Sequence, residues 1–317
     1  MTKVPTHIRL EMVPCNACGS IENEPFLDGR DRLHNMPGEF TSVRCKVCGL
    51  VYTSPRPILE DMHNFYPDDY GPHQPKSLKA RPKPFWNWVH NQMWKYPINQ
   101  LYMSPPLGGT LLEIGCGSGS FLMEAQQAGW KVTGIEINER ATKYAREQNL
   151  NVHCGTLHTV ELTGTFDLIR LSFVLEHVHD PLKTLQAVRR LLKPRGHAHI
   201  SIPNIGSMVA RLFGTYWYDL DMPRHLYWFT PSSFRLLCEK AGLLIVKAIG
   251  EINTRVFWAS INYWLVDKGV HSKIANGIKK WGSKSTLPIT FAIGWIPGKW
   301  LLTSRVHFIV APQTIRR

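Results

Sequence analysis

The chain has 317 residues, 44% of them apolar, which is enough for one large domain with an appendage or for two domains around a sizeable core. No stretch reaches the roughly eighteen consecutive apolar residues of a membrane-spanning helix, and the first fifteen residues contain no apolar signal-peptide core. We therefore expect a cytoplasmic protein.

The net charge of +13 is unevenly distributed. Residues 76–112 carry five basic and no acidic side chains, and residues 251–317 carry ten basic and two acidic ones. Both segments are also rich in tryptophan. Basic side chains mixed with tryptophan suit an anionic membrane surface or an anionic substrate, and nucleic acid is also possible. A basic surface kept only for solubility is the simpler alternative.

Four of the seven cysteines form two matching motifs, Cys15-x-x-Cys18-Gly19 and Cys45-x-x-Cys48-Gly49. Two thiolates on one tight turn can face the same tetrahedral ion, so this spacing predicts a structural zinc ribbon over residues 1–75, with all four cysteines as ligands. Two disulfides are the alternative, disfavoured in a cytoplasmic chain. Zinc ribbons often bind nucleic acid, but this segment has seven basic and ten acidic side chains, which argues against that role here.

A basic, aromatic linker or helix is expected over residues 76–107, bounded by the proline-rich strings RPKPFWNW and SPPLGG. The remaining residues, 108–317, read as one α/β domain.

That domain opens with the string LLEIGCGSGS over residues 111–120, an apolar run followed by a glycine-rich loop and a helical segment. Alternating glycines at the end of a strand allow a sharp turn and a close approach of the backbone to a ligand. The spacing is G-x-G-x-G after an acidic residue, whereas a nicotinamide-binding loop would read G-x-G-x-x-G.

The next strand, KVTGIEIN, ends near Glu136, which lies 17 residues after Gly119. A carboxylate at the tip of the second strand can accept both ribose hydroxyls of a nucleoside. Further strands are predicted for NVHC, FDLIRLS, HAHISIP, LLIVKAIG and RVHFIVA, alternating with helices. Asp180 and Thr230 are expected to cap the helices that begin at Pro181 and Pro231.

The strings LEIGCGSG, GIEIN, LEHVHDP, LLKPRGHAHISIPN and PRHLYWFTPSSF together resemble the class I S-adenosylmethionine (SAM) methyltransferases. With RCKVCGLVYTSPRP and FYPDDY, the chain resembles a bacterial subfamily that joins a four-cysteine zinc ribbon to such a domain. The resemblance implies a Rossmann-like, seven-stranded α/β sheet, SAM as cofactor and a structural zinc ion.

The resemblance also implies which residues bind the cofactor. The glycine loop would line the methionine and ribose side of SAM, Glu136 would hold the ribose, and the tips of the third and fourth strands would complete the site. The expected cofactor-binding residues are Glu113, Gly115, Cys116, Gly117, Gly119, Glu136, Ile137, Thr156, Ser172 and Phe173.

Two histidines are the candidate catalytic residues. His177 lies in LEHVHDP, after the fourth strand, and His225 lies in MPRHLYWF, after the fifth. An alcohol or phenol acceptor needs a base for its proton, and histidine suits that role. Glu176 is a weaker candidate, and His179 is expected to be a local hydrogen-bond partner. A structural role for either candidate histidine is the alternative.

Two inserts are expected to shape specificity, residues 204–230 after the fifth strand and residues 251–304 before the last strand. The second is apolar and aromatic with lysine clusters, so it predicts a helical cap. It could cover the active site, pair two copies of the chain, or rest peripherally on the inner face of a membrane.

The sequence thus predicts a SAM-dependent methyltransferase that methylates an oxygen of a sugar-containing, lipid-linked or other small molecule by in-line transfer. Methylation of nitrogen or carbon stays open. One alternative is an RNA methyltransferase, which the basic charge favours, although LSFVLEH stands where base-amine enzymes carry Asn/Asp-Pro-Pro-aromatic. Another is a non-catalytic zinc-ribbon scaffold with a methyltransferase fold.

Overall fold

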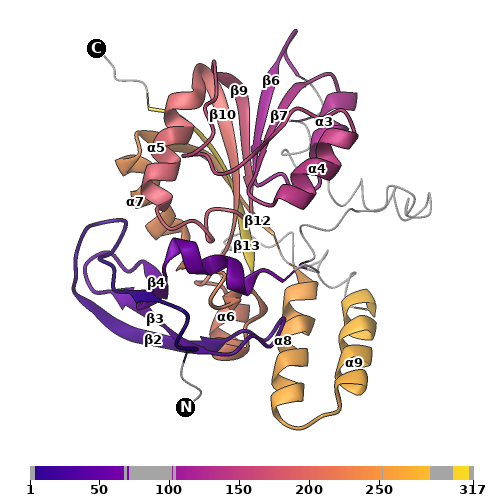
Figure 1. Cartoon of the computed structure of the whole chain (residues 1–317). Helices are drawn as coiled ribbons and strands as arrows, with labels where there is room; N and C mark the ends of the chain where they lie inside the picture. Colours follow the sequence, from indigo (N-terminus) through magenta and orange to yellow (C-terminus); the bar gives the residue numbers. More distant parts are fainter. Residues whose placement is uncertain are drawn as a thin grey trace. The chain divides into compact units, whose positions relative to one another are not determined.

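The computed structural model describes residues 4–67, 70, 102, 105–251, 253–285 and 303–313. A seven-stranded sheet has the order β12-β13-β10-β9-β6-β7-β8 (Figure 1). Its strands are β6 (Thr110–Ile114), β7 (Lys131–Glu136), β8 (Val152–Cys154), β9 (Phe166–Ser172), β10 (Leu192–Pro203), β12 (Leu243–Glu251) and β13 (Arg305–Pro312). The Rossmann-like α/β fold predicted from the sequence is confirmed.

The centre of this sheet is parallel. Strand β6 pairs with β7 on one side and with β9 on the other, and β7 pairs with β8. In register, Glu113 of β6 lies opposite Gly134 of β7 and Arg170 of β9. Parallel strands end at the same edge, so the loops that follow β6, β7 and β9 leave the sheet at its ligand-binding edge.

The helices of the α/β region are α3 (Ser120–Gln127), α4 (Glu139–Glu147), α5 (Pro181–Leu191) and α7 (Pro231–Lys240). Three of the four begin at a side-chain cap, and α3 begins directly after Gly119 of the glycine loop without one. The Asp180 carboxylate accepts the N–H of Lys183 at 2.8 Å, and Thr230 forms a capping box with Ser233. Both predicted caps are confirmed, and a proline follows each of them at the first helical position.

The N-terminal segment forms a second, antiparallel sheet of order β11-β4-β3-β2. Three of its strands are β2 (Asn23–Arg30), β3 (Glu39–Cys45) and β4 (Val51–Thr53), and the fourth is β11 (Tyr227–Trp228) from the predicted insert 204–230. The short strands β1 (Leu10–Glu11) and β5 (Arg56–Pro57) pair separately, and a 3₁₀ helix, η1 (Leu59–Phe65), follows.

The two predicted inserts contain helices. The first carries α6 (Met208–Phe213) and the 3₁₀ turns η3 (Gly214–Tyr216) and η4 (Tyr218–Leu220). The second carries α8 (Thr254–Asp267) and α9 (Ser272–Ser285), which lie side by side as a hairpin, shown in orange in Figure 1. The apolar run at 287–302 and most of the predicted linker at 76–107 lie outside the described residues. Among the helices that are described, none is long and apolar enough to cross a membrane.

Contacts divide the chain into two compact units. The first comprises Met1–Pro67, Phe173–Leu185 and Ile200–Val310, and the second comprises Asp68–Ser172, Gln186–His199 and Ala311–Arg317. The N-terminal cysteines and the candidate histidines therefore belong to the first unit, and the glycine loop and Glu136 to the second. The domain limits at residues 75 and 107 stay a prediction.

Candidate functional site

The two cysteine motifs fold into the same turn. In each, the N–H of the glycine donates to the carbonyl of the first cysteine, from Gly19 to Cys15 at 2.7 Å and from Gly49 to Cys45 at 2.9 Å. Both glycines have positive φ, 80° and 75°, which other residues rarely adopt. The glycine after each cysteine pair is therefore part of what makes the turn possible.

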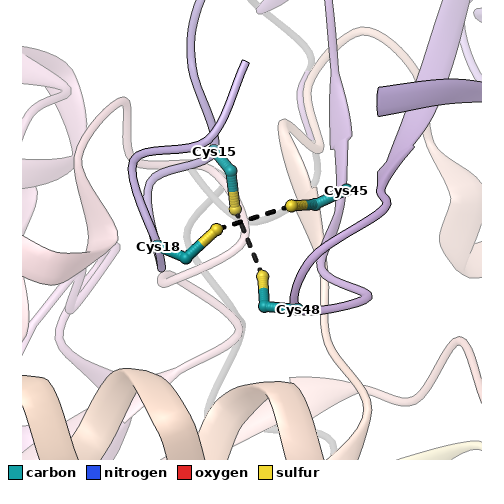
Figure 2. A group of neighbouring side chains, drawn as sticks. All are labelled: Cys15, Cys18, Cys45 and Cys48. Carbon is teal, nitrogen blue, oxygen red and sulfur yellow. Dashed lines mark hydrogen bonds between the residues drawn. The ribbon is translucent and has the colours of Figure 1, made fainter. Parts of the chain in front are cut away.

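These turns bring all four thiols together (Figure 2). The Sγ atoms of Cys15 and Cys48 are 3.4 Å apart, and those of Cys18 and Cys45 are 3.5 Å apart. A tetrahedron with Zn–S bonds of about 2.3 Å has edges of about 3.8 Å. Burial works to raise the pKa of the Cys45 thiol, but the N–H groups of Cys48 and Val47 bring it down to about 7. The cluster fits a zinc ion with four thiolate ligands and no open position.

The glycine loop turns away from β6 as the sequence predicts. Gly115, Gly117 and Gly119 have φ of 70°, 54° and 82°. A Cβ on Gly119 would lie 2.4 Å from the side chain of Leu150, so the loop also needs glycine for close packing. Cys116 is buried within the loop, and burial raises the pKa of its thiol.

Glu136 ends β7 directly beside this loop. Its carboxylate accepts the N–H of Gly117 at 2.8 Å and the N–H of Asn138 at 2.9 Å. The next residue, Ile137, is apolar yet 62% exposed. A carboxylate beside a glycine loop, followed by an exposed apolar side chain, fits a nucleoside with its ribose and adenine ring.

Glu113 instead points into the interior of the second unit. It forms an ion pair with Arg170, and one of its oxygens, Oε2, has no hydrogen-bond partner among the described residues. Burial raises the pKa of Glu113 to about 7, against the opposing effect of Arg170. The guanidinium of Arg170 also lies over the ring of Phe121 on α3, at 4.0 Å. Glu113 therefore anchors the base of the glycine loop.

The three remaining predicted cofactor-binding residues, Thr156, Ser172 and Phe173, lie at or just after the ends of strands. The Thr156 hydroxyl lies in a local turn with Thr159. Ser172 is half-buried at the end of β9. Phe173 follows with φ 57°, its N–H donates to Ser201 at 3.0 Å, and the guanidinium of Arg305 lies 4.5 Å from its ring. A positive φ in a bulky residue is a strained conformation, and such strain gathers at functional sites.

The two candidate histidines lie together with Glu176. One ligand atom from each of the three lies within 4.8 Å of the other two, and the imidazole rings of His177 and His225 pack edge to face at 4.6 Å. The carbonyl of Glu176 accepts the N–H of Leu226 at 2.7 Å, which ties the two loops together. We call these three side chains the histidine cluster.

Both histidine rings are oriented by main-chain carbonyls. His177 Nδ1 lies 3.0 Å from the carbonyl of Arg224, and His225 Nδ1 lies 2.8 Å from that of Asp219. A carbonyl only accepts, so each Nδ1 carries the proton and each Nε2 carries a lone pair; the Tyr66 hydroxyl, 3.2 Å from His177 Nδ1, then accepts from it as well. Burial lowers the pKa of His177 to about 3 and also lowers that of His225. Both rings are therefore neutral at pH 7.

Glu176 is fully buried, with both carboxylate oxygens lacking a hydrogen-bond partner among the described residues. Burial raises its pKa to about 8, even though its own main-chain N–H counters part of the shift. His179, by contrast, points its Nε2 at the carbonyl of Pro57 at 3.1 Å. It is a hydrogen-bond partner as predicted, but the bond is long-range, across 122 residues, and not local.

A buried ion-pair network holds the loop that carries His225. The fully buried Arg224 donates to Asp31 at 2.6 and 2.8 Å, to Asp221 at 2.6 Å and to the carbonyl of Phe65. Arg305 pairs with Asp219, whose carbonyl orients His225. Sequence reasoning missed this network and the central place of Glu176. The only features of the sequence that pointed to them were the adjacent residues Glu176–His177 and Arg224–His225.

A glycine loop beside a strand-end carboxylate on a seven-stranded sheet is the arrangement that the sequence analysis predicted for a methyltransferase. A family described as "Methyltransferase domain" matches residues 86–248, just over half of the chain. The chain belongs to this methyltransferase family. Its fold is that of the class I SAM-dependent methyltransferases, and the protein is accordingly an enzyme that uses SAM.

Named relatives agree with this family. The chain is 29% identical over 157 residues to the ubiquinone biosynthesis O-methyltransferase of Aromatoleum aromaticum, covering 45% of this chain and 67% of that protein. It is 30% identical over 181 residues to the enzyme of the same name from Haemophilus ducreyi, covering 49% and 77%. A SAM-dependent methyltransferase structure from Mesorhizobium loti aligns with 17% identity and a TM-score of 0.45, covering 68% of this chain and 96% of that one.

Proposed function

We propose that this enzyme transfers the methyl group of SAM to a hydroxyl oxygen of a small molecule. Two relatives at 29 and 30% identity are named O-methyltransferases. The single observation that carries the proposal is the histidine cluster, because two neutral imidazoles lie together, each with one unprotonated ring nitrogen that can accept a hydrogen bond from a hydroxyl.

In this proposal the second unit binds the methyl donor. The glycine loop, with Gly115, Cys116, Gly117 and Gly119, passes close to the methionine part, and Glu136 accepts the ribose hydroxyls. Ile137 packs on the adenine, and Thr156 and Ser172 complete this part of the site; a contact of Phe173 with the cofactor stays a prediction from the sequence. Glu113 acts through Arg170 by holding the loop in place. When bound, SAM supplies a methyl group activated by its sulfonium.

The acceptor hydroxyl would bind at the histidine cluster. His177 would orient the oxygen, since burial lowers the pKa of its ring to about 3 and makes it a weak base, and His225 would take the proton of the hydroxyl. Alignment of oxygen, carbon and sulfur would provide most of the remaining acceleration. The loop that carries Glu176 and His177 begins at the carboxyl end of β9, in keeping with a role at the ligand-binding edge.

The four cysteines would hold a structural zinc ion, which fits the predicted zinc-ribbon subfamily. A four-thiolate site has no position for a substrate, so the ion would stabilise the N-terminal sheet and the strand β11 that joins it. Cytoplasmic location, peripheral contact of residues 251–304 with a membrane, and self-association stay predictions.

The acceptor class can be tested with radiolabelled methyl groups. Purified zinc-loaded enzyme is incubated with [methyl-³H]SAM and one of four acceptors: a catechol, a nucleotide sugar, a polyprenyl-linked sugar or total RNA. We expect label on an oxygen of a small molecule, as identified by mass spectrometry. The relatives are named for ubiquinone biosynthesis, which favours a hydroxylated aromatic acceptor, whereas the sequence favours a sugar or lipid-linked acceptor. Label on RNA alone, or on nitrogen or carbon, would contradict the proposal.

His225→Asn is the test of the proposed catalytic cluster. Loss of a positioned acid–base group lowers the rate by about 10²- to 10⁴-fold. The matched control is His179→Asn, in the same loop as His177, whose imidazole bonds to the carbonyl of Pro57; the substitution keeps the main-chain carbonyl that accepts from Arg56 and Tyr227. We expect the control to retain activity within about twofold, and both variants to bind S-adenosylhomocysteine normally. Equal activity of the two variants would remove the histidine cluster from the mechanism.

A further inference from the structure

We propose that Glu176, His177 and His225 bind one divalent transition-metal ion, at a site distinct from the four-cysteine cluster. The site uses the same three side chains as the proposed function: with an ion bound, His177 and His225 would be ligands instead of the base assigned above. Metal binding itself does not depend on which acceptor the enzyme methylates. Two imidazoles and one carboxylate are a ligand set that proteins use for zinc, iron and manganese.

The three side chains are spaced for a shared ion. One ligand atom from each lies within 4.8 Å of the others. Metal–ligand bonds of about 2.1 Å require ligand atoms about 3 to 4 Å apart, so a small approach of the side chains would complete the site. The main-chain bond from Leu226 to the carbonyl of Glu176 fixes the two contributing loops at this separation.

Each histidine is held as metal-binding histidines are held. Ligand imidazoles almost always donate their second ring N–H to a carbonyl, a carboxylate or water, which fixes the tautomer and aims the other nitrogen. His177 does so to the carbonyl of Arg224, and His225 to that of Asp219. One ring nitrogen of each histidine thus lies within 4.8 Å of the other's and of a Glu176 carboxylate oxygen.

Glu176 is the independent observation that calls for a cation. Its side chain is fully buried, and neither carboxylate oxygen has a hydrogen-bond partner among the described residues. Leaving a buried carboxylate charged and unpaired is costly, so such a group is protonated, paired with a cation or bound to a metal. The guanidinium of Arg305, the arginine that acts on Glu176, forms its ion pair with Asp219 instead.

A further oxygen lies beside the site. Asp221 Oδ2 is 3.9 Å from His225 Nε2. This oxygen also accepts a hydrogen bond from Arg224 Nε at 3.1 Å, so it lies near the ion without being one of the three proposed ligands. With three protein ligands, an ion here would keep coordination positions open for water or for an oxygen of a bound molecule, unlike the closed cysteine site.

Manganese(II) tests the proposal because it prefers nitrogen and oxygen ligands and leaves a four-thiolate zinc site intact. Zinc-loaded full-length protein, without SAM or acceptor, is titrated with MnCl₂, and free Mn²⁺ is followed by electron paramagnetic resonance. We expect one Mn²⁺ per chain. Glu176→Gln removes the carboxylate charge and should weaken binding by at least about 100-fold.

His225→Asn provides a second variant should Glu176→Gln fail to fold, and near-UV circular dichroism reports folding for both. His179→Asn is the control and should bind Mn²⁺ as the unmodified protein does. The proposal is overturned if the unmodified protein binds no Mn²⁺, or if folded Glu176→Gln or His225→Asn binds it with unchanged affinity. Failure of methyl transfer with Mn²⁺ binding intact would contradict the proposed function and leave the metal site standing.

Discussion

The two clusters of potential metal ligands in the first unit are built in opposite ways. The four cysteines come from two copies of one local turn, each with its own glycine and the same main-chain hydrogen bond. The histidine cluster draws Glu176 and His177 from the loop after β9, and His225 from a loop 48 residues later. Each half of the cysteine cluster is therefore formed by one local turn, and only the meeting of the two turns requires folding. The histidine cluster forms only when two distant loops come together.

This difference follows from what each cluster is suited to do. Four thiolates occupy all four coordination positions of a tetrahedral ion, so an ion in the cysteine site would have a structural role. The histidine cluster offers three ligands and depends on the buried network of Arg224, Asp31 and Asp221. A site with open positions therefore depends on side chains from distant parts of the chain. Three substitutions and one treatment with a chelator test this difference between the two clusters.

The largest effect is expected for Cys45→Ser. Three remaining thiolates bind zinc too weakly to hold the two turns, so the N-terminal sheet should lose its bound ion and unfold first. We expect a loss of more than about 3 kcal/mol in the free energy of unfolding, measured in urea together with zinc content. Cys154→Ser, at an exposed cysteine outside the cluster, should change stability by less than about 0.5 kcal/mol. A Cys45→Ser protein that keeps zinc and full stability would contradict a structural role.

Arg224→Met should have the next largest effect. The substitution leaves the Asp31 and Asp221 carboxylates buried without their guanidinium partner, which costs about 3 to 5 kcal/mol. Denaturant unfolding measures the loss, and Arg235→Met on the exposed side of α7 is the control. If the two variants were equally stable, the histidine cluster would not need the network described here.

Brief treatment with EDTA should separate the two clusters. A three-ligand site with open positions exchanges its ion readily, whereas a closed four-thiolate site holds zinc tightly. We expect added Mn²⁺ to be removed while about one zinc per chain remains, as measured by elemental analysis. Loss of both metals at the same rate would show that the proposed contrast between an open and a closed site is wrong.

The smallest effect is expected for Arg9→Ala. This substitution removes the ion pair between Arg9 and Asp61 in the N-terminal segment and touches neither cluster. The side-chain hydrogen bond from Arg9 lowers the pKa of Asp61 to about 2, below its ordinary value of 3.8. A lowered carboxyl pKa stabilises the fold above pH 3.8, and the benefit disappears as pH falls towards 2. The variant should therefore unfold slightly more easily at pH 7 than the unmodified protein, with the difference shrinking by pH 3. An equal difference at both pH values would contradict the ion pair.

The fold was largely predictable because its signals are local. The alternation of FDLIRLS matches β9, Phe166–Ser172, residue for residue, and Thr230 with Pro231 marks the start of α7. The cysteine cluster was predictable for the same reason, since each pair lies on one turn. The glycine loop and Glu136 were also brought together as their strand-end positions implied.

Long-range features were not predictable. Strand β11 joins the N-terminal sheet although Tyr227 is 175 residues from its partner Tyr52. The pairing of Arg224 with Asp31 spans 193 residues. A two-residue strand and a single ion pair are too short to produce a periodic sequence pattern. Their partners are determined by tertiary packing, so the sequence does not predict them. Glu176 was ranked below the histidines because its burial cannot be read from LEHVHDP alone.

Isothermal titration of S-adenosylhomocysteine into zinc-loaded protein tests the central claim, that this chain is a SAM-dependent methyltransferase with its cofactor at the glycine loop and Glu136. Glu136→Ala should bind at least about tenfold more weakly, because it loses charge-assisted hydrogen bonds to the ribose. The control Glu147→Ala, at the exposed end of α4, should bind normally. Absence of binding to the unmodified protein, or equal binding to Glu136→Ala, would contradict the account.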